Sequence, residues 1–501
     1  MRAENGDQID DTAARRRRFH RALLAALLLA VVVRCVHLTL LTGVTADAPG
    51  YIKFAARLSP ATLGRDLQAY YPPLYPAAIR AVHELGLDWT EAGRTISFMA
   101  GVAAVGVTGL IAGALLGPEV GAVAAVLAAV HTHLVRASTS VLAEMFYGFM
   151  VAVWGLLVLR PGGDRRFAAA AVLGAVSTTA RVEGLVLAPL TLVAALWHAP
   201  RSHWVRRAVV VTAAAAAVLV PLLLVAKMHT GAWAVSGKEV AIIARKYGVE
   251  STGILGLVFG HPVAFLSRYP QQLGEQLLHI ASVVLIVLAV PTVVGLLAPL
   301  DRPARHARRF ILLTVGVVTL GVATINPGRR YVVPLLPLLL PWTALGLLRI
   351  LELARSGRLG RPGTVLARRA RTIALLGLAV LTLHAARPEY SRWAECLVDV
   401  CHWIDARHSP APPVMARDSR IAYLCKAPYV HEPRTLSPKE IAEVVAESEA
   451  RLWILKAKRR PRVLPAGVTL VTELCESRTR LLVYDVAPVG DDDPGRLAPP
   501  G

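Results

Sequence analysis

Long apolar runs recur along the chain from residue 21 to residue 386, and short polar links separate them. Most of these runs approach the roughly 20 residues that an α-helix needs to cross the hydrocarbon core of a bilayer. The pattern predicts an all-α polytopic membrane bundle of about eleven transmembrane helices. We place these spans at about 21–42, 94–116, 119–136, 141–159, 167–181, 184–199, 207–227, 277–299, 310–325, 331–350 and 371–386.

The link over residues 43–93 carries two amphipathic patterns, which the pair Pro72-Pro73 separates. In each pattern the apolar side chains repeat at helical spacing and the charged side chains fall elsewhere, which predicts two helices lying along the bilayer surface. The first stripe contains Tyr51, Phe54, Ala55 and Leu58, and the second contains Tyr75, Ala78, Ile79, Val82 and Leu85.

Beyond residue 387 the hydrophobicity falls and the pattern becomes mixed. Residues 389–407 have the periodicity of an amphipathic helix, and Ser437-Pro438 is typical of the start of another helix that runs to about Ala450. Residues 452–455 and 481–484 have the composition of buried strands. We therefore expect a small α/β domain over 387–487 and a disordered tail over 488–501.

Composition agrees with a membrane protein, because 55% of the residues are hydrophobic and the mean hydropathy is +0.51. The formal net charge of +21 would indicate nucleic acid in a soluble protein. Here the arginines gather in the links between apolar runs, as the positive-inside rule describes, so we expect no nucleic acid partner.

The positions of these basic links also predict the orientation of the chain. If the N-terminal segment 1–20 lies in the cytoplasm, all the later basic links fall on the same side. The loops 43–93 and 228–276 and the C-terminal domain then lie outside the cytoplasm. Loop 228–276 fits either a substrate-gating loop or an interfacial amphipathic pair. The arginine- and alanine-rich usage leads us to expect a bacterial inner membrane.

Four of the five cysteines, all except Cys35, fall in the predicted external domain. Cys396 and Cys401 lie on one predicted helix and point too far apart to bridge each other. A Cys425–Cys475 disulfide and a set of buried free thiols both remain open. No cysteine or histidine has the spacing of a zinc site, so the sequence indicates no metal, although a divalent cofactor stays an open question.

Two carboxylates lie where apolar runs meet their outer links. Asp47 follows the first span, and Glu144 begins the fourth. Acidic residues at such boundaries generally face a bundle interior or a cavity. The structural alternatives are an N-cap at Asp47, and a first-turn glutamate favoured by the helix dipole at Glu144.

Two further segments place charges at outer links. In TTARVEG, Arg181 and Glu183 are candidates for a site or for a simple ion pair. In NPGRRY, Arg329 and Arg330 oppose the positive-inside bias, which favours a phosphate contact over interfacial anchoring.

Together, these segments resemble the GT-C glycosyltransferases that use a polyprenyl-phosphate sugar donor, the protein mannosyltransferase and lipid A aminoarabinose transferase group. The resemblance covers roughly residues 20–350 and rests on the acidic residue after the first span, the YPPLYP turn, TTARVEG and NPGRRY. It departs from the family at Asp47-Ala48, where an acidic pair is common, so Asp66 is a further candidate.

The resemblance implies a catalytic domain over residues 21–386 that moves a sugar, with inversion, from a polyprenyl-phosphate donor to a lipid, glycan or protein acceptor. It implies Asp47 as the base and Glu144 as the second catalytic carboxylate. The substrate-binding residues that it implies are Arg181, Glu183, Arg329, Arg330, Tyr331, Tyr51 and Tyr71. The rivals are a secondary transporter, which would show internal repeats, and an inactive scaffold that displays the external domain.

Overall fold

The computed structural model of the chain describes residues 2–41, 43–59, 71–230, 242–244, 246–249, 254–356, 372, 376–386, 392–416, 418–431, 450–457, 468–474 and 480–486. They fall into two compact units. A helical unit contains residues within 1–40 and 50–388, and a mixed unit contains residues within 41–49 and 389–501.

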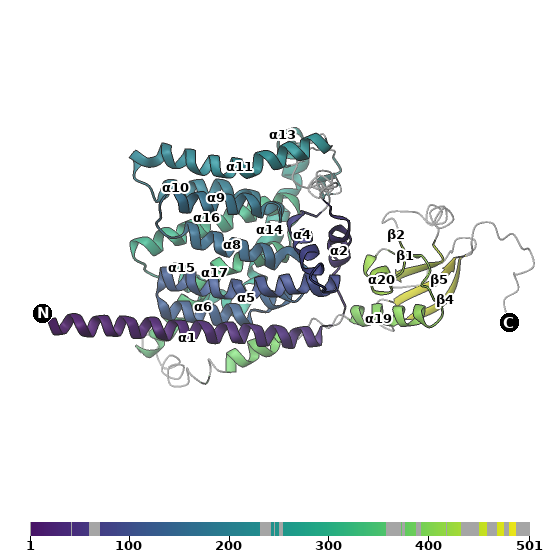
Figure 1. Cartoon of the computed structure of the whole chain (residues 1–501), viewed down its shortest axis with the longest axis horizontal. Coiled ribbons are helices and arrows are strands. Elements are labelled where there is room, and N and C mark those ends of the chain that lie inside the picture. The colour runs from purple at the N-terminus through teal and green to yellow at the C-terminus, as the bar shows by residue number, and fades with distance from the viewer. Residues whose placement is uncertain are drawn as a thin grey trace, which may run out of the picture. The chain divides into compact units, whose positions relative to one another are not determined.

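The helical unit is built from helices that run alongside one another over most of its length (Figure 1). Its α-helices are α1 (Arg2–Leu40), α2 (Ala48–Arg57), α4 (Leu74–His83), α5 (Trp89–Leu116), α6 (Pro118–Val130), α7 (Thr132–Ser138), α8 (Ala143–Val158), α9 (Asp164–Ser177), α10 (Leu187–Trp197), α11 (Trp204–Thr230), α13 (Ile254–Gly260), α14 (Pro262–Val283), α15 (Ile286–Leu297), α16 (Arg302–Ile325) and α17 (Leu336–Arg355). Short 3₁₀ turns are η1 (Val182–Val186), η2 (Arg201–His203), η3 (Arg329–Tyr331) and η4 (Val333–Leu335).

Five helical stretches among the described residues are long and apolar enough to cross a membrane, and the number is seven if two bent pairs each count as one span. The five are 14–40, 89–116, 201–229, 302–324 and 329–355, and the bent pairs are α6 with α7 and α14 with α15. The chain is therefore an integral membrane protein with a helical bundle, as the sequence predicts. The total of eleven spans remains a prediction.

Two expected spans have a different course. The helix expected over 119–136 is divided into α6 and α7, with a bend of 58° between them. The sequence pattern predicts a single helix over 277–299, but α14 ends at Val283 and α15 begins at Ile286, with a bend of 98° between the pair. Leu285 adopts a φ of 66° at this break, which is unusual for a leucine. The local sequence has no glycine or proline at the break, so hydrophobicity alone predicts a continuous helix.

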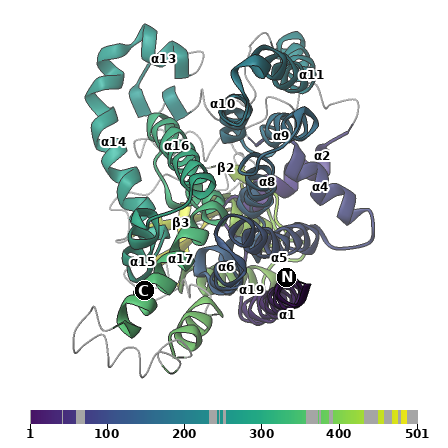
Figure 2. The ribbon, with the colours of Figure 1, turned by 90° about the vertical axis from the view of Figure 1, so that its left-hand side faces the viewer.

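The interior of the bundle centres on α17, which packs against α5, α6, α8 and α15 (Figure 2). In its most apolar window 89% of the residues are buried, whereas α11 has only 11% buried. Helices α15 and α17 approach each other at Gly295 and Gly346, where a Cβ atom would overlap the facing backbone. Glycine is required there because only a hydrogen side chain fits between the two backbones.

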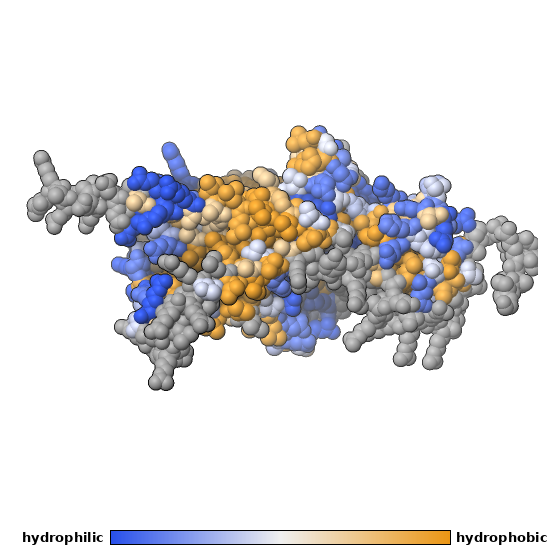
Figure 3. Space-filling model, turned by 90° about the horizontal axis from the view of Figure 1, so that it is seen from below, coloured by the Kyte–Doolittle hydropathy of each residue, from blue (hydrophilic) through white to orange (hydrophobic). Residues whose placement is uncertain are grey.

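Large apolar side chains also remain on the outside of the helical unit. On the face seen in Figure 3, apolar residues form an orange band with hydrophilic blue residues beside it. Exposed large apolar side chains over the whole helical unit include Val205, Val209, Val263, Leu266, Leu278, Val287, Val290, Leu297 and Leu320. An exposed apolar surface of this extent fits contact with lipid, since a soluble monomer rarely shows one.

The two helices expected in the first external loop are present as α2 and α4. Tyr51, Phe54, Ala55 and Leu58 of the predicted α2 stripe are all buried. Helix α4 is anchored at its start, where the Leu74 N–H donates to the carbonyl oxygen of Thr179 over 2.8 Å. Asp66, the alternative acidic candidate, lies outside the described residues.

The mixed unit contains a five-stranded sheet in the order β2-β1-β3-β5-β4. Its elements are α19 (Arg392–Asp405), β1 (Val414–Ala416), α20 (Ser419–Leu424), β2 (Tyr429–His431), β3 (Leu452–Ala457), β4 (Val468–Leu474) and β5 (Arg480–Val486). Strand β1 is parallel to β2 and β3, whereas β5 pairs antiparallel with β3 and β4. This confirms the small C-terminal sheet. The expected helix after Ser437 lies outside the described residues.

Alternate side chains of the strands form two cores in this unit. Ile454, Leu481 and Val483 pack with the apolar face of α19, while Trp453 and Tyr484 pack on the opposite face of the sheet. The period of two along a strand explains the division, because successive side chains point to opposite faces. Residues 452–455 and 481–484, which the sequence pattern predicts as strands, lie within β3 and β5.

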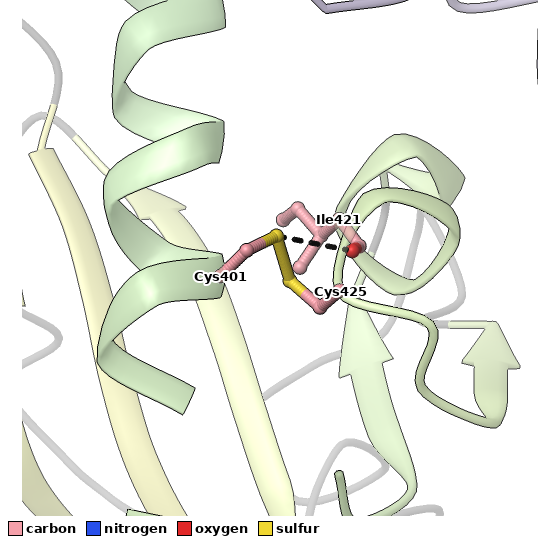
Figure 4. Close-up of a disulfide and its surroundings, with 3 residues drawn as sticks. All are labelled: Cys401, Ile421 and Cys425. Carbon is pink, nitrogen blue, oxygen red and sulfur yellow. Dashed lines mark hydrogen bonds between the residues drawn. A yellow bond between two sulfur atoms is a disulfide. The ribbon is translucent and has the colours of Figure 1, made fainter. Parts of the chain in front are cut away.

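A disulfide joins α19 to the end of α20. Cys401 and Cys425 form this bond, and their Cα atoms are 4.7 Å apart (Figure 4). The suggested Cys425–Cys475 disulfide and the free-thiol alternative are therefore both wrong for Cys425. Cys396 is also disulfide-bonded. The fold brings α20 against α19, and the sequence pattern alone gave no sign of that contact.

Candidate active site

Glu144 and Arg181 form a buried ion pair in the helical unit. Arg181 Nη1 lies 2.9 Å from Glu144 Oε1, and the two side chains are only 6% and 3% exposed. Glu144 lies in the first turn of α8 and Arg181 follows the end of α9. Charges buried to this degree are normally paired, because an isolated ion pays a large desolvation penalty.

Glu183 holds the same guanidinium from a second direction. Arg181 Nε donates to Glu183 Oε2 over 3.2 Å, and Arg181 Nη2 donates to Glu183 Oε1 over 3.1 Å. This two-pronged contact is possible because Arg181 is extended, with φ −153° and ψ 140°, and the 3₁₀ turn η1 begins at the next residue. The expected Arg181–Glu183 pair is thus present, but it is part of a larger buried cluster.

Tyr331 connects this cluster to the predicted cation-rich segment. The Arg181 Cζ atom lies 5.1 Å from the centroid of the Tyr331 ring, and the Arg330 Cζ atom lies 5.2 Å from it. Arg330 Nη2 also donates to the Tyr331 hydroxyl over 3.3 Å. One aromatic ring therefore contacts two guanidinium groups, which is a favourable cation–π arrangement.

Three tyrosines on and next to α2 and α4 form an aromatic group beside Arg181. The Tyr51 ring lies 4.3 Å from that of Tyr71 and 5.1 Å from that of Tyr75, measured between centroids. Tyr51 also interacts electrostatically with Arg181. The ring of Tyr71 packs so closely on the backbone of Gly50 that a Cβ there would overlap it.

Tyr75 and Ser97 support the start of α8, and the sequence pattern indicates no site role for either. The Tyr75 hydroxyl donates to the Gly93 carbonyl oxygen over 3.0 Å and lies 2.8 Å from Ser97 Oγ. Ser97 Oγ in turn donates to the carbonyl oxygen of Leu142, the N-cap residue of α8, over 3.1 Å. This chain of polar contacts fixes the helix turn that carries Glu144.

The predicted residues separate into two groups. The fold brings together Glu144, Arg181, Glu183, Arg330, Tyr331, Tyr51 and Tyr71. Arg329 precedes Arg330 and is exposed to solvent. Asp47 is half-buried in the turn directly before α2 and belongs to the segment 41–49 that is grouped with the mixed unit.

One carboxylate oxygen of the cluster, the buried Glu144 Oε2, has no hydrogen-bond partner among the described residues. Arg181, by contrast, directs its nitrogens toward two carboxylates. No group of three or more histidine, cysteine, aspartate and glutamate side chains in the described residues could hold a metal ion.

Comparisons with known proteins identify the fold. No protein-family model matches the sequence, and no curated protein matches it significantly. Among solved structures, ArnT from Cupriavidus metallidurans bound to undecaprenyl phosphate aligns with a TM-score of 0.55 at 14% identity, covering 93% of this chain and 98% of ArnT.

A second solved structure is AglB, the oligosaccharyltransferase of the archaeon Archaeoglobus fulgidus, in complex with an inhibitory peptide and a dolichol-phosphate. It aligns with a TM-score of 0.56 at 14% identity, over 87% of this chain and 69% of AglB. ArnT and AglB are GT-C glycosyltransferases. The chain therefore has the GT-C fold, which confirms the fold that the sequence resemblance implied.

Proposed function

We propose that this protein is a membrane glycosyltransferase that moves a sugar from a polyprenyl-phosphate donor to an acceptor hydroxyl. The observation that carries the proposal is the buried Glu144–Arg181 pair with the half-buried Glu183, which Tyr331 joins to Arg330 on a GT-C fold. Two solved proteins with this fold hold undecaprenyl phosphate and a dolichol-phosphate.

Arg329 and Arg330 bind the phosphate of the donor in this proposal. Arg181 is occupied by two carboxylates, whereas Arg329 is exposed and Arg330 is half-buried beside it. Guanidinium groups match phosphate geometry and stabilise the charge that grows on the departing oxygen. Arg181 does not bind the phosphate directly in this proposal. It positions the Tyr331 ring, which Arg330 also contacts.

Asp47 is the proposed base. Its carboxylate takes the proton of the acceptor hydroxyl while the acceptor oxygen forms a bond to the anomeric carbon. The bond from that carbon to the phosphate oxygen breaks, and its electron pair leaves on the polyprenyl phosphate. Attack from the face opposite the phosphate inverts the anomeric configuration. Chain connectivity supports this role, because Asp47 precedes by four residues the Tyr51 that interacts with Arg181.

Glu144 orients the acceptor or a cationic group on it through Oε2, while Oε1 remains on Arg181. Tyr51 and Tyr71 contact the substrate from the aromatic side of the site. The acceptor is a lipid, a glycan or a protein. Following the positive-inside rule, the N-terminus lies in the cytoplasm, and the reaction and the mixed unit lie on the other side of a bacterial inner membrane.

Transfer from a labelled undecaprenyl-phosphate sugar by the purified protein in lipid nanodiscs tests the proposal. We expect Asp47→Asn to lower the transfer rate at least a hundredfold, as the loss of a general base does. Asparagine caps helices as well as aspartate does, so a capping role at Asp47 predicts no loss.

Asp88→Asn is the matched control, because Asp88 is an N-cap whose side chain accepts from the Thr90 N–H over 2.9 Å. We expect it to keep wild-type activity. Full activity in Asp47→Asn would exclude Asp47 as the base and transfer that role to Glu144 or Asp66. Failure of the wild type with every polyprenyl donor, together with saturable uptake into vesicles, would favour a transporter.

A further inference from the structure

A row of polar side chains runs along one face of α14, a helix that is otherwise largely apolar on its outer side. The row consists of Arg268, Gln272 and Gln276, each four residues from the next, with Tyr269 beside them. Residues four apart lie on the same face of a helix, one turn above each other. Gln272 and Gln276 are only 7% and 1% exposed, so their amides are buried.

The N-terminal part of the row, Arg268 and Gln272, forms hydrogen bonds with residues 246 and 247. Arg268 donates to the Lys246 carbonyl oxygen, and Lys246 Nζ lies 3.4 Å from Gln272 Oε1. Gln272 Nε2 donates to the Tyr247 hydroxyl over 2.9 Å, and that hydroxyl donates to the Thr324 carbonyl oxygen over 2.7 Å. Burial raises the pKa of Tyr247, which keeps its hydroxyl a neutral donor.

Gln276, at the C-terminal end of the row, contacts the segment 326–331, which we call the cation turn. Gln276 Oε1 accepts a hydrogen bond from the Gly328 N–H over 2.8 Å, although the two residues are 52 positions apart. The Tyr331 N–H donates to the Gly328 carbonyl oxygen over 3.2 Å. Both backbone groups of Gly328 are therefore held immediately before Arg329 and Arg330.

The sequence of the cation turn makes this contact important. Pro327 has no N–H, and the Asn326 N–H is used by the Val322 carbonyl oxygen over 2.9 Å. The Gly328 N–H is thus the first donor of the turn that a side chain outside it can hold. The Gly328 N–H is part-buried, so its hydrogen bond to Gln276 helps to stabilise the conformation of the turn in which the two residues meet.

We propose that Gln276 is a positioning residue for the cation turn and that it sets the direction in which Arg329 and Arg330 meet a phosphate. The ligand part of this inference rests on the proposed function, whereas the effect on the turn does not. The observation behind it is the contact of one buried glutamine amide with the backbone that carries both arginines.

Hydrogen–deuterium exchange of the protein in nanodiscs tests the structural part without any substrate. Gln276→Met has nearly the same shape but no acceptor, and we expect the peptide containing Gly328 to exchange roughly tenfold faster. Gln276→Glu keeps an acceptor oxygen, and we expect it to restore slow exchange. Gln271→Met is the control, because Gln271 lies on the same helix with an exposed side chain.

Binding of undecaprenyl phosphate and of undecaprenol then tests the ligand part. The two lipids share a tail and differ in the phosphate, so general damage to the bundle weakens both equally. We expect Gln276→Met to weaken undecaprenyl phosphate binding about five- to tenfold, consistent with loss of one hydrogen bond, and to leave undecaprenol binding unchanged.

The outcomes separate the inference from the proposed function. Unchanged exchange at Gly328 in Gln276→Met, in a protein that melts like the wild type, overturns the positioning role and leaves the glycosyltransferase proposal intact. The second outcome is faster exchange at Gly328 in Gln276→Met, combined with a wild-type protein that binds undecaprenyl phosphate no better than undecaprenol. That result keeps the positioning role and overturns the proposal that Arg329 and Arg330 bind phosphate. Equal weakening of both lipids contradicts the assignment of Gln276 to phosphate binding.

Discussion

Arg34 and Arg181 are both buried in the helical unit, and they differ in what surrounds them. Arg34 of α1 is completely inaccessible, and Arg181 is 5% exposed. Arg181 is held by the carboxylates of Glu144 and Glu183 and lies over an aromatic ring. Arg34 Nη1 instead donates to two backbone carbonyl oxygens, those of Ala30 and Ala129, each over 3.1 Å.

The position of Ala129 explains what Arg34 does. Ala129 lies in the last turn of α6, where backbone carbonyls have no partner within the helix and a cation is favourable. Arg34 Nε and Nη2 find no hydrogen-bond partner among the described residues. Arg34 is therefore a helix cap inside the bundle.

Burial of a charge therefore does not by itself mark a reactive site. At Arg181, side chains from α8, η1 and η3 converge on one guanidinium, and one carboxylate oxygen is left over. At Arg34 the partners are backbone carbonyl oxygens, one on α1 itself and one on the neighbouring helix α6. The first arrangement uses side chains whose chemistry can be directed at a substrate, and the second completes a helix end.

The strongest test of this difference is Arg181→Met. It leaves the buried carboxylate of Glu144 and the half-buried carboxylate of Glu183 without the Arg181 cation, and breaking a buried pair typically costs about 3 to 5 kcal/mol. We expect loss of sugar transfer and a large decrease in the free energy of unfolding, measured by thermal melting in detergent. Adding Glu144→Gln to this variant should recover part of the stability and none of the activity. A stable Arg181→Met protein would contradict the buried ion cluster.

Glu144→Gln is expected to separate stability from activity. The forked contact between Arg181 and Glu183 stays in place, and the new amide oxygen still accepts from Arg181, so we expect about 1 to 2 kcal/mol of destabilisation. Transfer should fall roughly a hundredfold if the carboxylate acts on substrate. Single-turnover measurements at saturating donor check this, and near-normal rates would reduce Glu144 to a structural partner of Arg181.

A matched pair at Tyr331 tests the ring that Arg181 and Arg330 share. Tyr331→Leu removes the cation–π contacts, each worth about 0.5 to 2 kcal/mol, and should raise the donor KM about tenfold. Tyr331→Phe keeps the ring and loses only the weak contact from Arg330, so its donor KM should rise no more than about threefold. Equal effects of the two changes would mean that the hydroxyl, not the ring, matters.

The smallest effect is expected at Arg34. In Arg34→Met the loss of two carbonyl contacts is offset by relief of a buried charge, so the stability should change by no more than about 2 kcal/mol. Transfer by the folded protein should stay within about twofold of the wild type. An inactive but stably folded Arg34→Met protein would show that the α1 arginine belongs to the site and is more than a helix cap.

The membrane class, the helical bundle, the small C-terminal sheet and the short segments that carry charge can all be inferred from the amino-acid sequence alone. These features depend on local pattern, since apolar runs, amphipathic periods and prolines act over a few residues. Glu144, Arg181, Arg330 and Tyr331 could be chosen from the sequence because each stands where an apolar run meets a polar link.

Which of these residues contact one another depends on the packing of the whole helices, and the sequence pattern does not reveal it. Arg181 takes Glu144 from another helix as its partner, Gln276 reaches Gly328, and Cys401 pairs with Cys425. The sequence also does not predict the bend between α14 and α15, because no glycine or proline lies at the break. Contacts between distant positions follow from how whole helices pack, and a period of 3.6 residues identifies the packed face of a helix without identifying its partner.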